Sequence, residues 1–453
     1  MKKKKSVKKV QAEVKTPGFF IVALGCPKNL VESEIISGAM LAQDYRICFE
    51  PVDADVYIID TCAFLPEARR EAAEAIAEAV VWKSEAPGRS IVVAGCLYNH
   101  AERADFQRRF PEVDLWVPVN DTARIPELLA GKNAAGDDAG ISFLGDEKMP
   151  KLQLTLPHVA YLKISDGCDN RCSYCAIPSL RGKLRSRSIA SVVIEARRLL
   201  ANGVKELIVI AQDITAFGHD RPESGENFAA LLRQLDDLPG EFMIRLLYTH
   251  PAHYTDELID VLSSAKHILP YLDMPLQHIS DRILSEMNRH IDKAGICTLL
   301  DKLRQNIPNL ILRTTFITGL PGESDEEFEE LYSFVKKYKF DRVGVFSYAA
   351  EPGTPAAVMK HQIPAEVADE RAARLLKSQI ARMKRQQKKL VGTAMKVLVD
   401  TVDSNGLAAA RGASDAPEID NVVYFIANKH TKPGKFVTVN ITGVDRTDLI
   451  AEL

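Results

Sequence analysis

The stretch from Asp166 to Arg187 reads DGCDNRCSYCAIPSLRGKLRSR and contains three cysteines in the spacing C-x-x-x-C-x-x-C. Thiolates grouped this closely favour zinc or an iron–sulfur cluster over hard cations. The residues before them, from His158 to Ile164, alternate as a β-strand does. We therefore expect the cysteines in a loop at the carboxyl end of a strand, where barrel enzymes place their chemistry. We call Cys168, Cys172 and Cys175 the loop trio.

The number of ligands in this loop separates two metal interpretations. A structural zinc site is closed by four ligands, and the only nearby residue that could supply a fourth is His158. A [4Fe–4S] cluster held by three cysteines keeps one iron free of protein, so that iron can bind a small molecule. The three-cysteine count favours the cluster, with a zinc knuckle or a buried structural group of thiols as the alternative.

Length and composition predict a soluble protein of several domains. The chain has 453 residues, 46% hydrophobic residues, 26% charged residues and a net charge of −3. No apolar run approaches the length of a membrane span, and the lysine-rich residues 1–16, predicted to be a solvated tail, do not resemble a signal peptide. These features predict a cytoplasmic protein without membrane contact. In a reducing cytosol, grouped cysteines indicate metal or cluster binding rather than disulfides.

Three similar segments precede the loop trio. Residues 19–26, 56–62 and 90–96 are each an apolar run that ends in a cysteine, and each is followed by a helical pattern. Runs that are apolar throughout are typical of parallel strands covered on both faces, so the order predicts a doubly wound, flavodoxin-like α/β domain over residues 17–130. The carboxyl ends of such strands meet at one edge of the sheet. We therefore predict a second three-cysteine cluster, against coincidence or a redox-active pair. Its ligands, here named the N-terminal trio, are Cys26, Cys62 and Cys96.

A Gly-, Ala- and Asp-rich linker is predicted over residues 131–154. Over residues 155–388, six predicted strands alternate with helical patterns, which indicates an incomplete (β/α) barrel. Polar residues or Gly/Pro turns follow five of these strands and are expected to form a lined mouth over the loop trio. They include Gln212, His250, Gln277, His278 and the turn from Gly319 to Glu323.

The carboxyl-terminal part of the chain has a different character. A helix with eight Lys or Arg residues among residues 371–389 precedes it, and we expect either a solvated face or a contact with phosphate. Residues 391–453 alternate as in a small β-barrel of oligonucleotide-binding style, resembling a TRAM domain. This part has six basic and eight acidic residues, with Asp415, Glu418 and Asp420 close together. We therefore predict that these three acidic residues recognise a basic protein.

With Tyr174 just before its last cysteine, the loop trio resembles the signature loop of the radical S-adenosylmethionine enzymes. In that family the free iron chelates the methionine part of S-adenosylmethionine, and the aromatic residue lies beside the adenine. The resemblance implies that Tyr174 and Gln212 help to hold this cofactor. It implies the same for the turn that contains Gly319, Pro321, Gly322 and Glu323.

The whole domain order resembles the methylthiotransferases. Leu24-Gly-Cys-Pro-Lys-Asn-Leu-Val-Glu-Ser-Glu34 and Ala416-Pro-Glu-Ile-Asp420 are similar to the RimO branch, which modifies an aspartate of ribosomal protein S twelve. The MiaB branch, which modifies an adenosine of transfer RNA, is the alternative. The resemblance implies a transferase with two [4Fe–4S] clusters and S-adenosylmethionine. It also implies a monomer that takes electrons from a donor such as flavodoxin or ferredoxin.

The mechanism implied by this resemblance uses no catalytic protein side chain. The loop-trio cluster reduces S-adenosylmethionine, and the resulting adenosyl radical takes hydrogen from the β-carbon of the aspartate. The cluster of the N-terminal trio presents sulfur, which is methylated by a second S-adenosylmethionine. Acid–base groups cannot ionise such a carbon–hydrogen bond, so a cofactor must supply the chemistry. A non-enzymatic iron–sulfur redox protein is the alternative of another class, for which a lined mouth would be superfluous.

Overall fold

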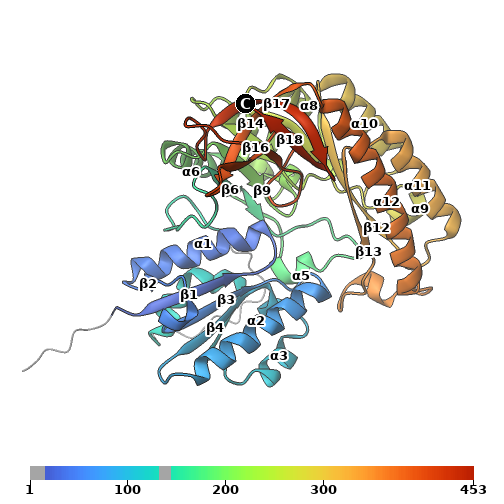
Figure 1. Cartoon of the computed structure of the whole chain (residues 1–453). Helices are drawn as coiled ribbons and strands as arrows, with labels where there is room; N and C mark the ends of the chain where they lie inside the picture. Colours follow the sequence, from blue (N-terminus) through green and yellow to red (C-terminus); the bar gives the residue numbers. More distant parts are fainter. Residues whose placement is uncertain (1–15, 132–143) are drawn as a thin grey trace, which may run out of the picture.

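The computed structural model describes residues 16–131 and 144–453. The chain folds into an N-terminal α/β domain, a central domain around a parallel sheet, and a small terminal β-barrel (Figure 1). The predicted lysine-rich tail and the middle of the predicted linker lie outside the described residues. Among the helices that the structure describes, none combines the length and the apolar character that a membrane crossing requires.

The N-terminal domain is built on a five-stranded parallel sheet in the order β2-β1-β3-β4-β5, which confirms the doubly wound prediction. Apolar side chains of α1 cover one face of the sheet and those of α2 cover the other, so the central strands are buried on both sides. The edge strands β2 and β5 are too short to show a pattern in the sequence. The strands are β1 (Gly18–Ala23), β2 (Arg46–Ile47), β3 (Val56–Thr61), β4 (Ser90–Gly95) and β5 (Leu115–Val117). The helices are α1 (Pro27–Ala42), α2 (Pro66–Ser84), α3 (Arg103–Arg109) and α4 (Ile125–Leu129).

The described end of the predicted linker, residues 144–154, packs along α1. The Leu152 amide donates to the Glu34 carbonyl at 2.9 Å, and the Leu154 amide donates to the Glu34 carboxylate at 3.0 Å. Burial raises the pKa of the Glu34 carboxyl to about 7. This part of the linker is therefore a packed element of the fold.

The central domain has a six-stranded parallel sheet in the order β13-β12-β11-β10-β9-β6, the incomplete barrel predicted from the sequence. A short hairpin of β7 and β8 holds the loop trio just after β6. Ser324 and Glu327 form a capping box, and α11 begins at Asp325. The strands are β6 (Val159–Lys163), β7 (Ser165–Asp166), β8 (Arg185–Ser186), β9 (Glu206–Ile210), β10 (Met243–Leu246), β11 (Ile268–Asp273), β12 (Ile311–Thr318) and β13 (Arg342–Ser347). The helices are α5 (Ile177–Arg181), α6 (Ile189–Ala201), α7 (Phe228–Asp236), α8 (Asp256–Ser264), α9 (Asp281–Glu286), α10 (Lys293–Asn306) and α11 (Asp325–Tyr338).

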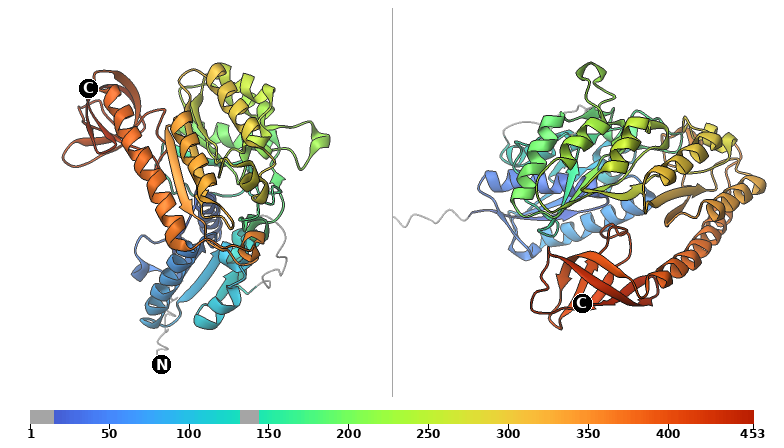
Figure 2. Two further views of the ribbon diagram at one scale, coloured as in Figure 1. Left: turned by 90° about the vertical axis from the view of Figure 1, so that its right-hand side faces the viewer. Right: turned by 90° about the horizontal axis from the view of Figure 1, so that it is seen from above.

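A 26-residue helix, α12 (Ala365–Leu390), joins the central domain to the terminal barrel and appears as a long rod in Figure 2. The barrel is closed, with its strands in the order β14-β15-β16-β18-β17. Closure leaves no exposed sheet edge. Its strands are β14 (Ala394–Val402), β15 (Leu407–Arg411), β16 (Val423–Ile426), β17 (Phe436–Asp445) and β18 (Asp448–Glu452).

The loop between β15 and β16, residues 412–420, inserts into the central domain, and we call it the insertion segment. Ala416 is fully buried in an apolar cluster with Tyr161 of β6 and Tyr271 of β11. Arg245 of β10, also fully buried, donates to the Ala413 carbonyl at 2.9 Å and to Glu206 of β9 at 2.7 Å. The insertion segment thus supplies polar partners for charged groups that the six-stranded sheet buries.

Candidate active site

One cavity of about 430 Å³ lies between the N-terminal and central domains, and both cysteine trios line it. All six cysteines are free thiols rather than disulfides. Predicted residues Tyr174, Gln212 and His250 also line this cavity. Further lining residues that the sequence did not single out include Asn29, Asn170, Arg181, Tyr248 and Arg289.

The N-terminal trio is positioned by the ends of three neighbouring strands. Cys26 caps α1 after β1, Cys62 follows β3 directly, and Cys96 begins a short 3-10 turn after β4. Gly25 between β1 and α1 has φ +90°, and a Cβ there would lie 2.3 Å from the Cβ of Cys62. Only glycine permits this close approach in a left-handed conformation. The local turns therefore bring the strand-end cysteines to one wall of the cavity.

The loop trio forms the opposite part of the lining. Arg289, which is buried, points its Nη1 at the Cys172 sulfur (3.6 Å) and at the Tyr174 hydroxyl (3.5 Å). Burial raises the pKa of Cys168 to about 11 and that of Cys175 to about 12. Thiolate is the form that binds metal, so cluster assembly here must release protons.

A buried network of charges joins the two walls. Lys163 of β6 donates to Glu32 of α1 at 2.8 Å and to Asp166 of β7 at 2.7 Å. Arg181 of α5 donates to the Cys96 sulfur at 3.1 Å and pairs with Glu32. The two cations and the two carboxylates of this network thus offset the free-energy cost of burying one another's charge. Their ion pairs also hold the N-terminal domain against the central domain.

Four buried polar atoms of the cavity lining have no hydrogen-bond partner in the described protein. They are Gln212 Oε1, His250 Nε2, Gln277 Oε1 and Arg289 Nε. Buried polar atoms are normally paired, so this mixed set of acceptors and donors indicates a polar ligand. The donor set therefore fits the groups that the sequence implies: two three-cysteine sites for [4Fe–4S] clusters, and a polar lining for S-adenosylmethionine.

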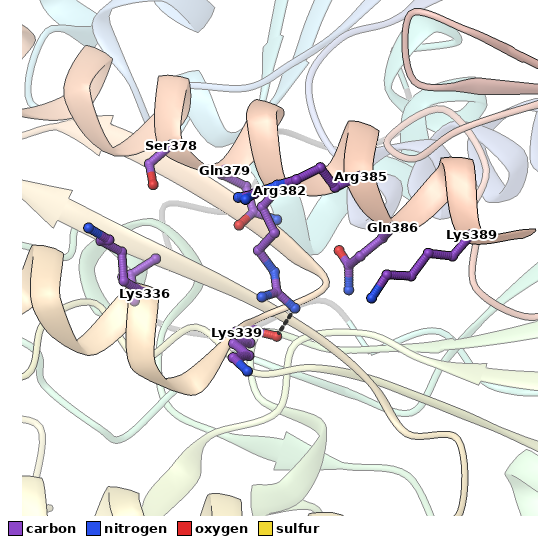
Figure 3. Close-up of a pocket in the computed structure, with 9 residues that line it drawn as sticks. Lys336, Lys339, Ser378, Gln379, Arg382, Arg385, Gln386 and Lys389 are labelled. Atoms are coloured by element: carbon purple, nitrogen blue, oxygen red, sulfur yellow. Dashed lines mark hydrogen bonds between the residues drawn. The ribbon is translucent and has the colours of Figure 1, made fainter.

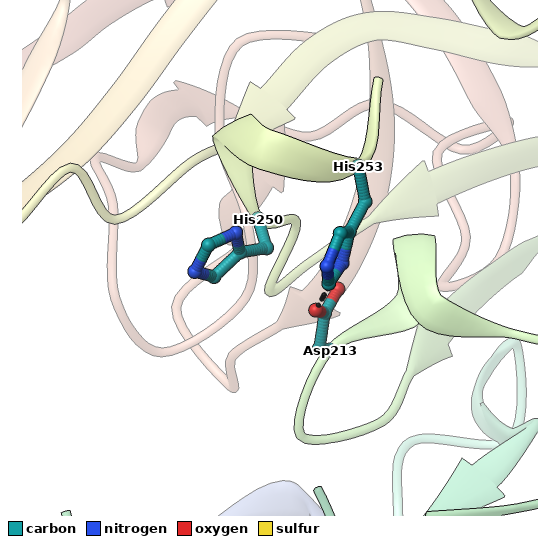
Figure 4. Close-up of side chains that lie close together, drawn as sticks. All are labelled: Asp213, His250 and His253. Atoms are coloured by element: carbon teal, nitrogen blue, oxygen red, sulfur yellow. Dashed lines mark hydrogen bonds and ion pairs between the residues drawn. The ribbon is translucent and has the colours of Figure 1, made fainter. Parts of the chain in front are cut away.

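The ring nitrogen of His250 that has no protein partner, Nε2, is a hydrogen-bond donor. The ring accepts a hydrogen bond from the Ala252 amide at Nδ1, so a neutral ring carries its proton at Nε2. Burial, together with the charge of Arg289, lowers the pKa of His250 to about 2, which keeps the ring neutral. His250 therefore presents an N–H donor, and its ring stacks on that of His253, with the ring centroids 4.9 Å apart (Figure 4).

Asp213, His250 and His253 bring three possible metal-ligand atoms within 4.8 Å of one another. The Asp213 carboxylate, however, already accepts hydrogen bonds from Asn170 (2.9 Å), from the amide and hydroxyl of Thr215, and from His253 (2.8 Å). Although burial opposes ionisation, these partners hold the pKa of Asp213 at about 2. Its role in this structure is to brace the loop after β9.

The turn from Gly319 to Glu323, predicted to hold the cofactor, is absent from the lining of this cavity. The Glu323 carboxylate is buried and engaged by His278 at 3.1 Å and Arg371 at 2.6 Å. The Glu323 carboxylate anchors α12 to the end of β12, so the predicted cofactor role of Glu323 stays a prediction without a contact to the cavity. For Gly319, Pro321 and Gly322 the cofactor role stays a prediction without a contact to the cavity.

The predicted recognition surface on the terminal barrel is wrong in part. The Asp415 and Asp420 side chains are only 2% exposed, and both pair with Arg342 of β13. Tyr271 donates a further hydrogen bond to Asp420 at 2.6 Å. These two carboxylates fix the insertion segment to the central domain. Glu418 is exposed, so its recognition role stays a prediction.

The position of His158 excludes it as a fourth zinc ligand beside the loop trio. His158 lies at the start of β6, and its Nε2 contacts Asp400 of the terminal barrel at 3.1 Å. It does not line the cavity that contains the loop trio. The zinc-knuckle alternative has therefore lost the only fourth ligand that the sequence offered.

Family models match all three parts of the chain. Residues 162–335 match the Radical SAM superfamily, residues 18–118 match Uncharacterized protein family UPF0004, and residues 391–453 match the TRAM domain. Among solved structures, the radical S-adenosylmethionine methyltransferase TsrM from Kitasatospora setae has a TM-score of 0.58. The match covers 87% of this chain and 80% of TsrM at 13% identity, which shows a shared fold.

Relatives extend over nearly the full length. The chain is 41% identical to "Ribosomal protein uS12 methylthiotransferase RimO" of Trichlorobacter lovleyi over 96% of this chain and 97% of the relative. It is 39% identical to the protein of the same name in Geobacter sulfurreducens, over 96% of this chain and 98% of the relative. The chain therefore belongs to the RimO family of radical S-adenosylmethionine methylthiotransferases.

Proposed function

We propose that this chain transfers a methylthio group to the β-carbon of an aspartate in ribosomal protein uS12. The observation that carries the proposal is that both cysteine trios line one cavity. A reaction that forms a carbon radical and then joins it to sulfur needs both centres within reach of one substrate atom. An electron carrier needs no such shared, polar-lined space.

Two [4Fe–4S] clusters and S-adenosylmethionine, when bound, supply the radical and the sulfur. The six cysteines of the loop trio and the N-terminal trio are the proposed ligands of the two clusters. In the proposal, Gln212, Gln277 and His250 orient the polar groups of S-adenosylmethionine, because each keeps a buried polar atom without a protein partner. Tyr174 supplies an apolar face for the adenine. No side chain is assigned the role of nucleophile.

Family membership supports the choice of substrate, and the charge of the terminal barrel does not. Arg411 and Asp400 form a pair in the barrel, and Asp415 and Asp420 pair with Arg342 of the central domain. Without these residues, five basic and five acidic side chains remain between residues 391 and 453. Once these pairs are set aside, the barrel has no net negative charge with which to attract a basic protein.

Further parts of the proposal come from the family resemblance. They are a monomeric, cytoplasmic enzyme and a flavodoxin or ferredoxin as electron donor. The proposed substrate is tested with the full chain, reconstituted with iron and sulfide under anaerobic reduction. The chain is incubated with S-adenosylmethionine and either purified uS12 or transfer RNA. Mass spectrometry should find one added methylthio group on an aspartate of uS12 and none on transfer RNA. Modification of transfer RNA alone would assign the chain to the other branch.

A further inference from the structure

A second cavity, of about 400 Å³, lies between the end of α11 and the second half of α12 (Figure 3). We call it the basic groove. Five basic side chains line it and no acidic side chain does: Lys336, Lys339, Arg382, Arg385 and Lys389. Along α12 the lining runs from Ser378 to Lys389, about 17 Å at the rise of an α-helix.

The positive charge of the basic groove is not neutralised by direct ion pairs, although the Asp341 carboxylate acts on Arg382. Among the described residues, these five side chains take part in no ion pair. Arg382 donates only to backbone carbonyls, those of Phe340 at 2.9 Å and Lys339 at 2.6 Å. Burial lowers the pKa of Arg382, the nearby Asp341 carboxylate opposes this shift, and the charges of Arg304 and Arg385 add to it. Exposed basic residues of this chain outside the groove, such as Arg233 and Lys302, do form ion pairs.

Two glutamines give the basic groove a second feature. Gln379 donates from Nε2 to the carbonyl of Asp341 at 3.0 Å, and Gln386 donates from Nε2 to the Asp341 carboxylate at 2.9 Å. These bonds identify Nε2 as the end of each amide that contacts Asp341. The Oε1 atoms of both residues are buried and have no partner. Each is therefore an acceptor that lacks a donor.

A phosphate diester alone does not account for both features of the groove. It can pair with the cations, but it has no hydrogen to donate to the glutamine Oε1 atoms. Ribose supplies this donor, since its 2′-hydroxyl is both donor and acceptor and lies beside the phosphates of an RNA strand. An acidic peptide offers carboxylates and backbone N–H donors as well, but RNA carries a permanent negative charge and a 2′-hydroxyl in every residue, which suits a row of five cations. Lysines in the last turn of α11 also compensate the helix dipole, yet this does not account for Arg382, Arg385 and Lys389 on α12.

We propose that the basic groove between α11 and α12 binds the ribose-phosphate backbone of RNA, with the five cations on phosphates and Gln379 and Gln386 accepting from 2′-hydroxyls. This function goes beyond the transfer reaction and does not depend on which substrate receives the methylthio group. The groove reads the backbone rather than bases, so it selects RNA over DNA without selecting a sequence.

The test measures binding of the full chain to a 20-nucleotide RNA hairpin and to a DNA hairpin of matching sequence, by fluorescence anisotropy at several salt concentrations. The variant Lys339→Glu/Arg385→Glu/Lys389→Glu changes three exposed side chains of the groove. It should bind the RNA hairpin at least tenfold more weakly. Each lost phosphate contact should reduce the slope of log affinity against log salt by about 0.7 to 0.9. The matched control is Arg70→Glu/Arg197→Glu/Lys266→Glu, which makes the same charge change on exposed residues outside the groove.

A second variant tests the ribose contact. Gln379→Met/Gln386→Met keeps side-chain length but removes both acceptors, and it should lower the preference for RNA over DNA by about fivefold for each lost hydrogen bond. Cleavage of S-adenosylmethionine by every variant reports that the fold is intact. The proposal is overturned if the groove variant and the control bind RNA equally, or if the parent protein binds RNA and DNA hairpins with the same affinity.

Discussion

The guanidinium of Arg181 lies 3.1 Å from the sulfur of Cys96, measured from Nε to Sγ, although the two residues belong to different domains. The same side chain donates to Asn29 at 2.9 Å and pairs with Glu32, both on α1. Arg181 follows the loop trio by a few residues. One arginine therefore ties the loop that carries one trio to the wall that carries the other.

Replacing Arg181 by Leu should destabilise the chain and stop methylthiolation. Glu32 and Asp166 would then share Lys163 as their only described cation, and breaking a buried ion pair from one side costs about 3–5 kcal/mol. Thermal unfolding measures this loss. Arg233→Ala, which removes an exposed partner of Glu257, serves as control and should change stability by about 0.5 kcal/mol or less. Equal stability of the two variants would contradict the assigned role.

Changing Cys168, Cys172 and Cys175 together to Ala should halve the iron content and abolish cleavage of S-adenosylmethionine. The physical reason is that, of the two clusters, only that of the loop trio is expected to bind and reduce S-adenosylmethionine. Iron analysis and quantification of 5′-deoxyadenosine check both parts. Retained cleavage would show that the cofactor binds elsewhere.

Changing Cys26, Cys62 and Cys96 together to Ala should also halve the iron, but 5′-deoxyadenosine should still form while methylthiolation stops. These cysteines line the cavity from the N-terminal domain and are expected to hold the sulfur-bearing cluster. Iron analysis of this variant beside the previous one makes the comparison direct. A full complement of iron in this variant would contradict a second cluster.

Removing both Asp415 and Asp420, by substitution with Ala, should destabilise the fold rather than alter substrate choice. Arg342, only 11% exposed, would lose both carboxylate partners, at a cost of about 3–5 kcal/mol. Denaturant unfolding measures the effect. Glu418→Ala in the same segment is the control, because its side chain is exposed and should change stability by about 0.5 kcal/mol or less. Similar values for both variants would mean that the insertion segment is not anchored by these carboxylates.

The raised pKa of Glu34 predicts a dependence of stability on pH. Its folded pKa of about 7 lies above the ordinary 4.5, so folding favours the protonated carboxyl. This contribution is fully present below about pH 4.5 and is lost as pH rises through 7. Glu34→Gln should therefore unfold with a free energy higher by on the order of 2 kcal/mol at pH 8, with little difference at pH 5. A difference that is the same at both pH values would contradict the assignment.

The cluster-bearing parts of the fold could be predicted because their signals are local. An apolar run that ends in a cysteine shows a buried strand and the residue at its end, and Cys26, Cys62 and Cys96 repeat this pattern. Partners that are distant in sequence give no such signal. Arg289 and Arg181 look like ordinary basic residues until the fold brings them to the cysteines.

The prediction that Asp415 and Asp420 form a recognition surface failed for the same reason. Their proximity to one another in sequence suggested a surface, but their actual partner, Arg342, is 73 residues from Asp415. Composition counts a charge in the same way whether it faces water or a buried guanidinium. A charge balance predicts a surface only after the buried pairs have been removed from it.

The insertion segment also bears on how the chain is completed during synthesis. Arg245 finds its carbonyl acceptor on Ala413, 168 residues later. Until the insertion segment has been synthesised, Arg245 lacks its Ala413 acceptor and Arg342 lacks both carboxylate partners, so the nascent central domain leaves these two cations partly hydrated. Closure of the sheet waits for the last domain to emerge. Final compaction around the two cysteine trios is therefore a late, long-range folding step, and a prematurely terminated chain would expose that unfinished interior to proteolysis.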